Sequence, residues 1–395
     1  MVKKEWRFDT LTVHGSEGID KVTGALSPPI YQSSTFSFKD ADTGAAIFKG
    51  ECKGYVYSRL GNPTQHCLEK EMAFLEGGEA ALAFSSGMAA ESAIMLTLCR
   101  PGDNYVCSST VYGGTHALNI GFLKRMNIEA REVDTTNVEN IVNAIDEKTK
   151  LIFIETPANP TLCITDIALC AEIAKKHNIV LAVDNTFATP VLQRPIELGA
   201  DIVMHSATKY IGGHGDTIAG VLVGGCELIS QIHKETLVEI GPCINPFSAW
   251  LLLRGLKTLS VRVRTHCNNA RHVAQYLCFH PKVDKVYYPG FRFHHGHDIA
   301  RRQMTDFGGM ISFELKADRE QTKKVINALE LCTQAVSLGD CDTLVCHPAS
   351  TTHSSYTVEQ LKDAGIPESL IRLSVGIEDP RDICDDLGQA LKQIC

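Results

Sequence analysis

The chain of 395 residues is long for one hydrophobic core and predicts two domains. Its 44% hydrophobic and 21% charged residues are typical of a globular protein, and no apolar run reaches the roughly 18 residues of a membrane span. A net charge of −8 argues against a nucleic-acid surface, and the first residues, MVKKEWRFDT, lack the apolar region of a secretory signal. We therefore expect a cytoplasmic protein without membrane or nucleic-acid partners.

The cysteines and one histidine cluster were considered as metal or disulfide sites. Fifteen cysteines, an odd number without any CxxC pair, indicate reduced thiols rather than a disulfide framework or a zinc site. His294, His295 and His297 lie in a glycine-containing loop with no second cluster to complete a ligand set. We expect that loop to be solvated and the protein to hold no metal.

Three segments follow one another along the chain. Residues 1–60, with the aromatic run YQSSTFSF, predict an extended arm that packs on another surface. Residues 61–245 alternate helical patterns with the apolar runs ALAFSS, NYVCSS, LIFIET, IVLAVDN, DIVMHSAT and IAGVLVGG, which predicts an α/β domain with a mostly parallel, doubly wound sheet. Residues 246–395 contain long amphipathic helices and then strand-like VDKVYYPG and GGMISFEL, which predicts a smaller C-terminal α/β domain.

Polar side chains follow these apolar runs, where parallel sheets bind ligands. Lys209 follows DIVMHS and precedes a glycine-rich stretch, a placement that suits a partly desolvated amine able to form a Schiff base. Asp184 ends IVLAVD, and a buried carboxylate there needs a partner such as a protonated pyridine nitrogen. A surface lysine and a helix-capping aspartate are the alternative interpretations.

The turn after the first apolar run, ALAFSS, suits a phosphate. Ser86, Gly87 and Met88 join a strand to a helix whose first N–H groups are free to bind an anion, and Ser206 and Thr208 could add hydroxyls. An ordinary strand-to-helix turn would look the same. The glycine-rich IGGHGDTIAG is not a dinucleotide-binding motif, and no P-loop or GxSxG motif occurs.

Two further residues are candidates for the substrate. Tyr112, in STVYGGTHA, could stack on a cofactor ring and serve as an acid or a base. Arg372, in LIRLSVG, enters a strand of the C-terminal segment and could bind a carboxylate with both of its terminal nitrogens. A half-buried loop tyrosine and a surface arginine are the alternatives.

At these residues the chain closely resembles the cystathionine γ-synthase/γ-lyase group of the Cys/Met-metabolism family, fold-type I enzymes that depend on pyridoxal 5′-phosphate (PLP). The motifs span nearly the whole chain. They are YSRLGNPT at 57–64, SSGMAA at 85–90, ETPANPT at 155–161, AVDNTF at 182–187, HSATKY at 205–210 and RLSVGIED at 372–379.

This resemblance implies a role for each matching residue. Lys209 would form the Schiff base, Asp184 would bind the pyridine nitrogen and Tyr112 would stack on the ring. The phosphate would be bound by Ser86, Gly87, Met88, Ser206 and Thr208, together with Tyr57 and Arg59 of a neighbouring subunit, so the active unit would be a homodimer, usually within a homotetramer. Ser337 and Arg372 would hold the substrate carboxylate, with Asn159 beside it.

Within this group, HGDTIAG, AVSLGD and HPASTTHSSYT look most like the methionine γ-lyases. Gly114 departs from them, because they usually carry cysteine at this position of the substrate pocket, and GPCINPFSAW is similar to the O-acylhomoserine sulfhydrylases. Val56 and Val336 stand where many cystathionine lyases carry glutamate, which favours a substrate with a short uncharged tail. The resemblance thus implies γ-elimination of L-methionine to 2-oxobutanoate, ammonia and a thiol. O-acetylhomoserine sulfhydrylase and cystathionine γ-lyase are the alternatives, and the residue set disfavours a non-enzymatic binder.

Overall fold

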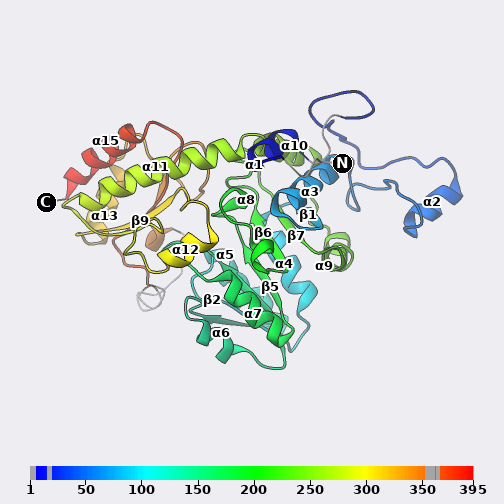
Figure 1. The fold of residues 1–395 in the computed structure, drawn as a ribbon, viewed down its shortest axis with the longest axis horizontal. Helices are drawn as coiled ribbons and strands as arrows, with labels where there is room; N and C mark the ends of the chain where they lie inside the picture. Colours follow the sequence, from blue (N-terminus) through cyan, green and yellow to red (C-terminus); the bar gives the residue numbers. More distant parts are fainter. Residues whose placement is uncertain (1–5, 16–19, 352–360, 362–364, 395) are drawn as a thin grey trace.

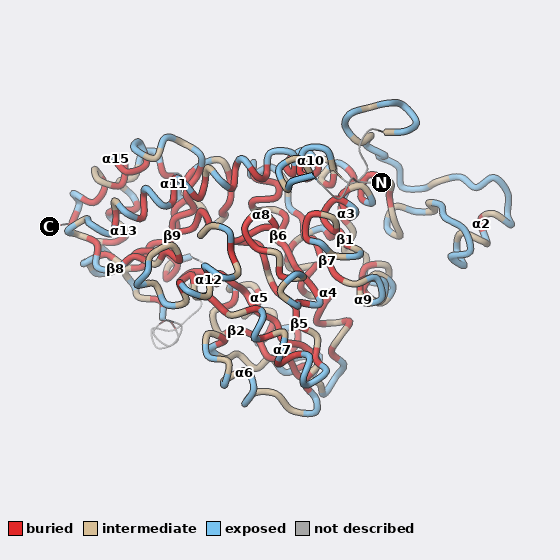
Figure 2. Tube along the Cα trace, in the orientation of Figure 1, coloured by how far each residue is buried: buried red, intermediate tan, exposed pale blue. Residues whose placement is uncertain are grey.

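A computed structural model describes residues 6–15, 20–351, 361 and 365–394. The part of HPASTTHSSYT from residue 352 onwards lies outside the described residues. The N-terminal segment contains two helices that the sequence did not predict, α1 (Phe8–His14) and α2 (Ala41–Phe48). α2 stands away from the body of the molecule, and most of the chain around it is exposed (Figures 1 and 2).

The central sheet has seven strands in the order β1-β7-β6-β5-β4-β2-β3. The strands are β1 (Ala80–Phe84), β2 (Asn104–Ser108), β3 (Glu129–Val133), β4 (Thr149–Glu155), β5 (Val180–Asp184), β6 (Ile202–Ser206) and β7 (Gly220–Gly224). β3, β2, β4, β5 and β6 are parallel, whereas β7 runs antiparallel to both of its neighbours. The expected mostly parallel sheet is therefore confirmed, with one reversed strand.

Helices cover both faces of this sheet, as a doubly wound fold requires. On one face, α4 (Gly87–Leu98) and α9 (Cys226–Ile232) bury apolar side chains against β1, β5, β6 and β7. On the other face, α3 (Pro63–Glu76) and α10 (Pro246–Leu256) pack together, and α7 (Ile167–His177) covers β4 and β5. Because both faces are covered, the strands are apolar almost throughout.

Helix α3 shows how the local sequence sets where a helix begins and ends. Asn62 precedes α3 and accepts a hydrogen bond from Thr64 N at 2.9 Å, and Pro63 stands where a helix needs no N–H donor. Gly77 ends the helix in the left-handed conformation, with φ of 76°. The motif YSRLGNPT thus contains the start signal of a helix.

The C-terminal part forms a second, five-stranded sheet in the order β10-β11-β12-β9-β8. Its strands are β8 (Val283–Tyr287), β9 (Met310–Leu315), β10 (Thr333–Gln334), β11 (Leu344–Cys346) and β12 (Leu370–Ser374). The long helix α11 (Leu259–Phe279) packs on it with α13 (Arg319–Asn327) and α15 (Pro380–Ala390), as Figure 1 shows. The two sheets lie within residues 61–245 and 246–395, and these domain boundaries remain a prediction.

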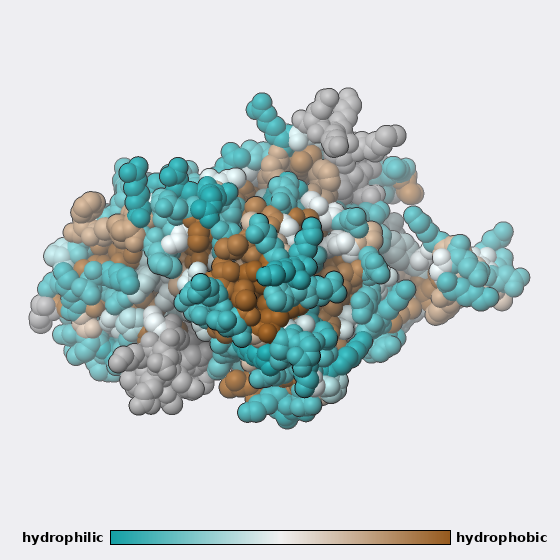
Figure 3. Space-filling view, turned by 60° about the horizontal axis from the view of Figure 1, so that its bottom comes forward, coloured by the Kyte–Doolittle hydropathy of each residue, from teal (hydrophilic) through white to brown (hydrophobic). Residues whose placement is uncertain are grey.

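Shorter elements connect these parts. They are α5 (Gly113–Leu118), the π-helix η1 (Asn119–Leu123), α6 (Val138–Ala144), α8 (Thr189–Leu192), η2 (Pro195–Leu198), the π-helix η3 (His233–Val238), α12 (His297–Gln303), η4 (Pro348–Ser350) and η5 (Leu391–Gln393). Among the described residues, no helix is both long enough and apolar enough to cross a membrane. On the face drawn in Figure 3, apolar side chains gather near the middle and are bordered by hydrophilic ones.

Candidate active site

The carboxyl ends of β5 and β6 bring the two central candidates to one edge of the sheet. Asp184 is the last residue of β5, and Lys209 follows β6 by one turn. Lys209 Nζ donates a hydrogen bond to Ser337 Oγ at 3.1 Å. Because Ser337 belongs to the C-terminal part, the site lies where the two parts of the chain meet.

The surroundings of Lys209 lower the pKa of its amine. Burial is the largest cause, and the nearby guanidinium of Arg372 acts in the same direction, while Asp340 opposes both. An amine whose charged form is penalised in this way is more readily neutral and nucleophilic. The expectation of a partly desolvated lysine at a strand end agrees with this geometry.

Arg372 is a buried cation on β12, with only 3% of its surface exposed. Its Nη1 donates to Asn159 Oδ1 at 3.0 Å, and its Nη2 donates to the carbonyls of Val336 and Ser337, both at 3.0 Å. Its Nε has no hydrogen-bond partner, and no carboxylate within the described ranges forms an ion pair with it. A buried guanidinium held only by neutral acceptors suits the carboxylate of an amino acid.

Asp184 is the reverse case, a carboxylate without a cationic partner among the described residues. Thr186 donates to Asp184 Oδ1 from its backbone N–H, at 2.9 Å, and from its hydroxyl. Burial raises the pKa of Asp184, against these two bonds and the nearby His205, and no lysine or arginine of the described chain pairs with it. The following helix, α8, begins only at Thr189 after Ala188, so Asp184 does not cap it. A half-buried carboxylate without a cationic partner suits a protonated pyridine nitrogen.

A close approach between α4 and β6 forms the candidate phosphate site. Ser86 caps α4 by accepting from Ala89 N at 3.0 Å, and the first N–H groups of the helix follow it. A Cβ on Gly87 would lie 2.9 Å from Ser206 Cβ, so only glycine allows this contact. Thr208 Oγ1 is engaged with Ala219, accepting from its N–H at 3.0 Å and facing its carbonyl at 3.2 Å. Ser206 and the N–H groups at the start of α4 are therefore better placed to bind a phosphate than Thr208, whose hydroxyl already bonds Ala219.

Tyr112 precedes α5 and is 46% exposed. A Cβ on Gly114 would lie 2.4 Å from Tyr112 Cε1 and 3.1 Å from Met88 Sδ. The tyrosine ring thus lies against Gly114, beside the first turn of α4. A larger residue at position 114 would have to displace this ring.

Sequence reasoning assigned no role to two buried carboxylates beside Asp184. Glu155, at the end of β4, accepts hydrogen bonds from the backbone N–H groups of Tyr112 and Asn159, each at 2.9 Å. Glu91, on α4, accepts from Thr115 Oγ1 at 2.9 Å, and burial raises its pKa to about 8. Their only sequence signal is position, since Glu155 ends an apolar strand and Glu91 interrupts an apolar helix.

Tyr57 and Arg59 lie apart from these residues. Both are exposed, Arg59 Cζ lies 5.7 Å from the centre of the Tyr57 ring, and Arg59 Nη1 donates to the carbonyl of Val238. In the described parts of the chain, no hydrogen bond or ion pair joins either residue to Lys209, Asp184 or Arg372. Their predicted role in a neighbouring subunit's site is untested.

The chain is similar to known proteins along almost its whole length. A family model described as Cys/Met metabolism PLP-dependent enzyme matches residues 9–392. An L-methionine gamma-lyase of Fusobacterium nucleatum subsp. polymorphum is 48% identical over all of both chains, and a cystathionine gamma-lyase of Bacillus subtilis is 46% identical over 98% of this chain and 99% of its own. The crystal structure of cystathionine gamma-lyase from Lactobacillus plantarum complexed with L-serine is 39% identical, with a TM-score of 0.93, covering 98% of this chain and 99% of its own.

Proposed function

Because this chain belongs to the family of Cys/Met metabolism PLP-dependent enzymes, we propose that it catalyses γ-elimination of L-methionine to 2-oxobutanoate, ammonia and a thiol. One observation carries the proposal. Arg372 is buried without a carboxylate partner in the described part of the chain, and Ser337 accepts hydrogen bonds from both Arg372 and Lys209. Asp184 lies at the same edge of the sheet as Lys209. The similar L-methionine gamma-lyases support methionine as the substrate.

The residues present suit PLP. We propose that Asp184 holds its pyridine nitrogen, that Tyr112 covers its ring, and that Lys209 forms the Schiff base. Its phosphate would be held by Ser86, Gly87, Met88, Ser206 and Thr208, with Tyr57 and Arg59 supplied by a second subunit. When bound, PLP draws electrons away from the bonds at the substrate's α-carbon.

The chain's own residues then orient the substrate and move its protons. Arg372, supported by Asn159 and Ser337, would hold the carboxylate, which places the α-carbon near Lys209. The Lys209 amine would remove and return protons at the α- and β-carbons, and the burial that lowers its pKa favours the neutral form that this role needs. Tyr112 would protonate the departing thiol. Hydrolysis of the remaining enamine yields 2-oxobutanoate and ammonia.

Product analysis tests this function. The purified holoenzyme would be incubated separately with methionine, homocysteine, cystathionine and O-acetylhomoserine, the last also with a thiol, and 2-oxobutanoate and sulfur products measured. We expect the highest kcat/KM for methionine elimination. Faster replacement of O-acetylhomoserine by a thiol would establish the sulfhydrylase alternative, and a preference for cystathionine the cystathionine γ-lyase alternative, which similar proteins of that name support.

Val336→Glu is expected to shift substrate preference toward cystathionine. Val336 is 61% exposed beside Ser337, so it does not pack a core and the substitution should fold. A carboxylate there could pair with the distal ammonium of cystathionine, a charged hydrogen bond of about 1.5–3 kcal/mol, or roughly 10- to 150-fold in the kcat/KM ratio. The ratio for cystathionine against methionine measures this shift. Val336→Gln, of similar size but neutral, is the control. An unchanged ratio in the folded glutamate variant would contradict the inference that Val56 and Val336 face the tail of the substrate.

We also propose that the active unit is a homodimer, assembled into a homotetramer, and located in the cytoplasm. Two observations support a shared site: Tyr57 and Arg59 are exposed, and in the described residues no hydrogen bond or ion pair joins them to Lys209, Asp184 or Arg372. Inactive Arg59→Ala and Lys209→Ala subunits, dissociated and mixed, are expected to regain roughly a quarter of wild-type activity, because half of the dimers are mixed and each contains one intact site. Activity is measured after mass spectrometry verifies the mixed dimers, and no recovery in those dimers would exclude the shared site.

A further inference from the structure

Glu155 connects two loops of the candidate site. Its Oε2 accepts the backbone N–H of Tyr112, and its Oε1 accepts the backbone N–H of Asn159, both at 2.9 Å. The first loop follows β2, and the second follows β4. With only 4% of its surface exposed, Glu155 uses one oxygen for each loop.

The contacts continue from Asn159 across the site. Asn159 Oδ1 accepts from Arg372 Nη1 at 3.0 Å, Arg372 Nη2 donates to the Ser337 carbonyl at 3.0 Å, and Ser337 Oγ accepts from Lys209 Nζ at 3.1 Å. Glu155 is therefore the junction between the loop of Tyr112 and the residues that hold a substrate carboxylate. A shift of either loop would change the distance between the proposed site of the cofactor ring, beside Tyr112, and the proposed site of the substrate carboxylate, at Arg372.

The chemistry of the position requires a carboxyl group. Two backbone N–H groups that point at one side chain need two acceptor oxygens, and a glutamine offers one acceptor and one donor. The ionised form of this carboxyl group is costly here, because burial and the nearby Asp184 both raise the pKa of Glu155. Its two loop contacts oppose that rise. Glu91 is a second buried carboxylate near Asp184, yet it contacts Thr115 instead of the two loops.

We propose that Glu155 is a positioning residue, which fixes the backbones of Tyr112 and Asn159 and thereby sets the spacing between the cofactor-ring and substrate-carboxylate sites. The catalytic use of this role rests on the proposed function. The loop contacts themselves do not depend on which amino acid is the substrate.

The test compares Glu155→Gln, Glu155→Asp and Glu91→Gln. In Glu155→Gln one N–H faces a donor, and in Glu155→Asp the shorter side chain cannot reach both loops. Glu91→Gln removes a carboxylate near Asp184 but leaves both loop contacts. Two measurements apply: hydrogen exchange of peptides spanning residues 110–114 and 156–162 in the apoprotein, and binding of L-norleucine to the holoenzyme by absorbance titration. L-norleucine matches methionine in shape but has no leaving group.

Both Glu155 variants should exchange faster in both peptides and bind L-norleucine roughly 10- to 100-fold more weakly, whereas Glu91→Gln should keep wild-type exchange. Wild-type exchange and binding in a folded Glu155 variant would overturn the proposal. Equal losses in Glu91→Gln would also overturn it, since the effect would then follow from the loss of any buried carboxyl group near Asp184 and not from the two loop contacts. If Glu155→Gln does not fold, Glu155→Asp decides by the same criteria. A wild type inactive on methionine, with this pattern intact, would refute the proposed function and leave the positioning role standing.

Discussion

Lys209→Ala is expected to leave a folded protein whose kcat/KM for methionine is at least about a thousandfold below wild type. The reason is that, in the proposed mechanism, Lys209 would supply both the Schiff-base amine and the proton carrier at one position, beside Ser337 and Arg372. Alanine removes the amine without adding bulk, and the side chain it replaces is only partly buried. The production of 2-oxobutanoate measures turnover, and circular dichroism measures folding.

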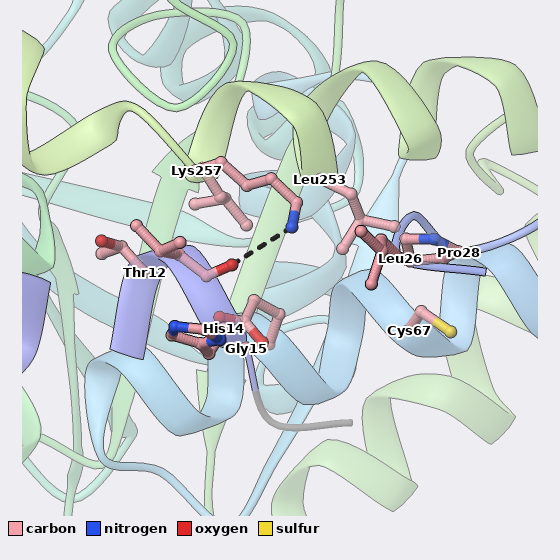
Figure 4. Close-up of a pocket in the computed structure, with 11 residues that line it drawn as sticks. Thr12, His14, Gly15, Leu26, Pro28, Cys67, Leu253 and Lys257 are labelled. Carbon is pink, nitrogen blue, oxygen red and sulfur yellow. Dashed lines mark hydrogen bonds between the residues drawn. The ribbon is translucent and has the colours of Figure 1, made fainter. Parts of the chain in front are cut away.

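Lys257→Ala is the matched control for this loss. Lys257 lies beside a small cavity between α1, α3 and α10, where its Nζ donates to the carbonyl of Val13 at 3.1 Å (Figure 4). That variant should keep wild-type turnover. Near-normal activity in Lys209→Ala would remove the basis for the proposed mechanism. A Lys209→Arg variant, which keeps the cation but not the nucleophile, should be as inactive as the alanine variant.

The buried strands could be predicted from the sequence, because both faces of the central sheet are covered and their runs are apolar throughout. The edge strand β3 was missed, since Glu129–Val133 has the polar sequence EAREV and only partial burial. β10 and β11 are two and three residues long, too short to show a period. The reversed direction of β7 was also missed. It follows a loop without a helix, so the alternation that predicts parallel pairing does not hold there.

The candidate site was predicted where chemistry and strand ends coincide. Lys209 and Asp184 stand at such ends, and Arg372 lies in a predicted strand, whereas Asn159 and Ser337 were placed by resemblance alone. Hydrogen bonds join Lys209 to Ser337 and Arg372 to Asn159 and Ser337. Glu155 ends the apolar run LIFIET, but the sequence indicates no role for it, because its partners are backbone N–H groups. Such partners leave no trace in residue identity, so only the three-dimensional arrangement reveals them.

Asp184→Asn is expected to lower kcat/KM for methionine by roughly 100- to 1,000-fold, with cofactor still bound. Asparagine keeps an oxygen for the two hydrogen bonds that Thr186 donates, so the local turn should persist. It removes the negative charge that would keep a pyridine nitrogen protonated, and without that proton the cofactor ring withdraws electrons less strongly. The absorbance of bound cofactor measures occupancy, and steady-state kinetics measures the loss of rate.

A carboxylate at the other end of the same strands provides the control. Asp201 Oδ2 accepts from Leu181 N at 2.8 Å at the amino end of β5 and β6, and an asparagine there can keep this bond. Asp201→Asn should therefore keep wild-type kinetics. If Asp184→Asn were equally active while folded and loaded with cofactor, the negative charge of Asp184 would have no catalytic role. If it lost cofactor and stability together, Asp184 would be a structural residue. A rate loss with cofactor retained is the result that separates an electrostatic role from both.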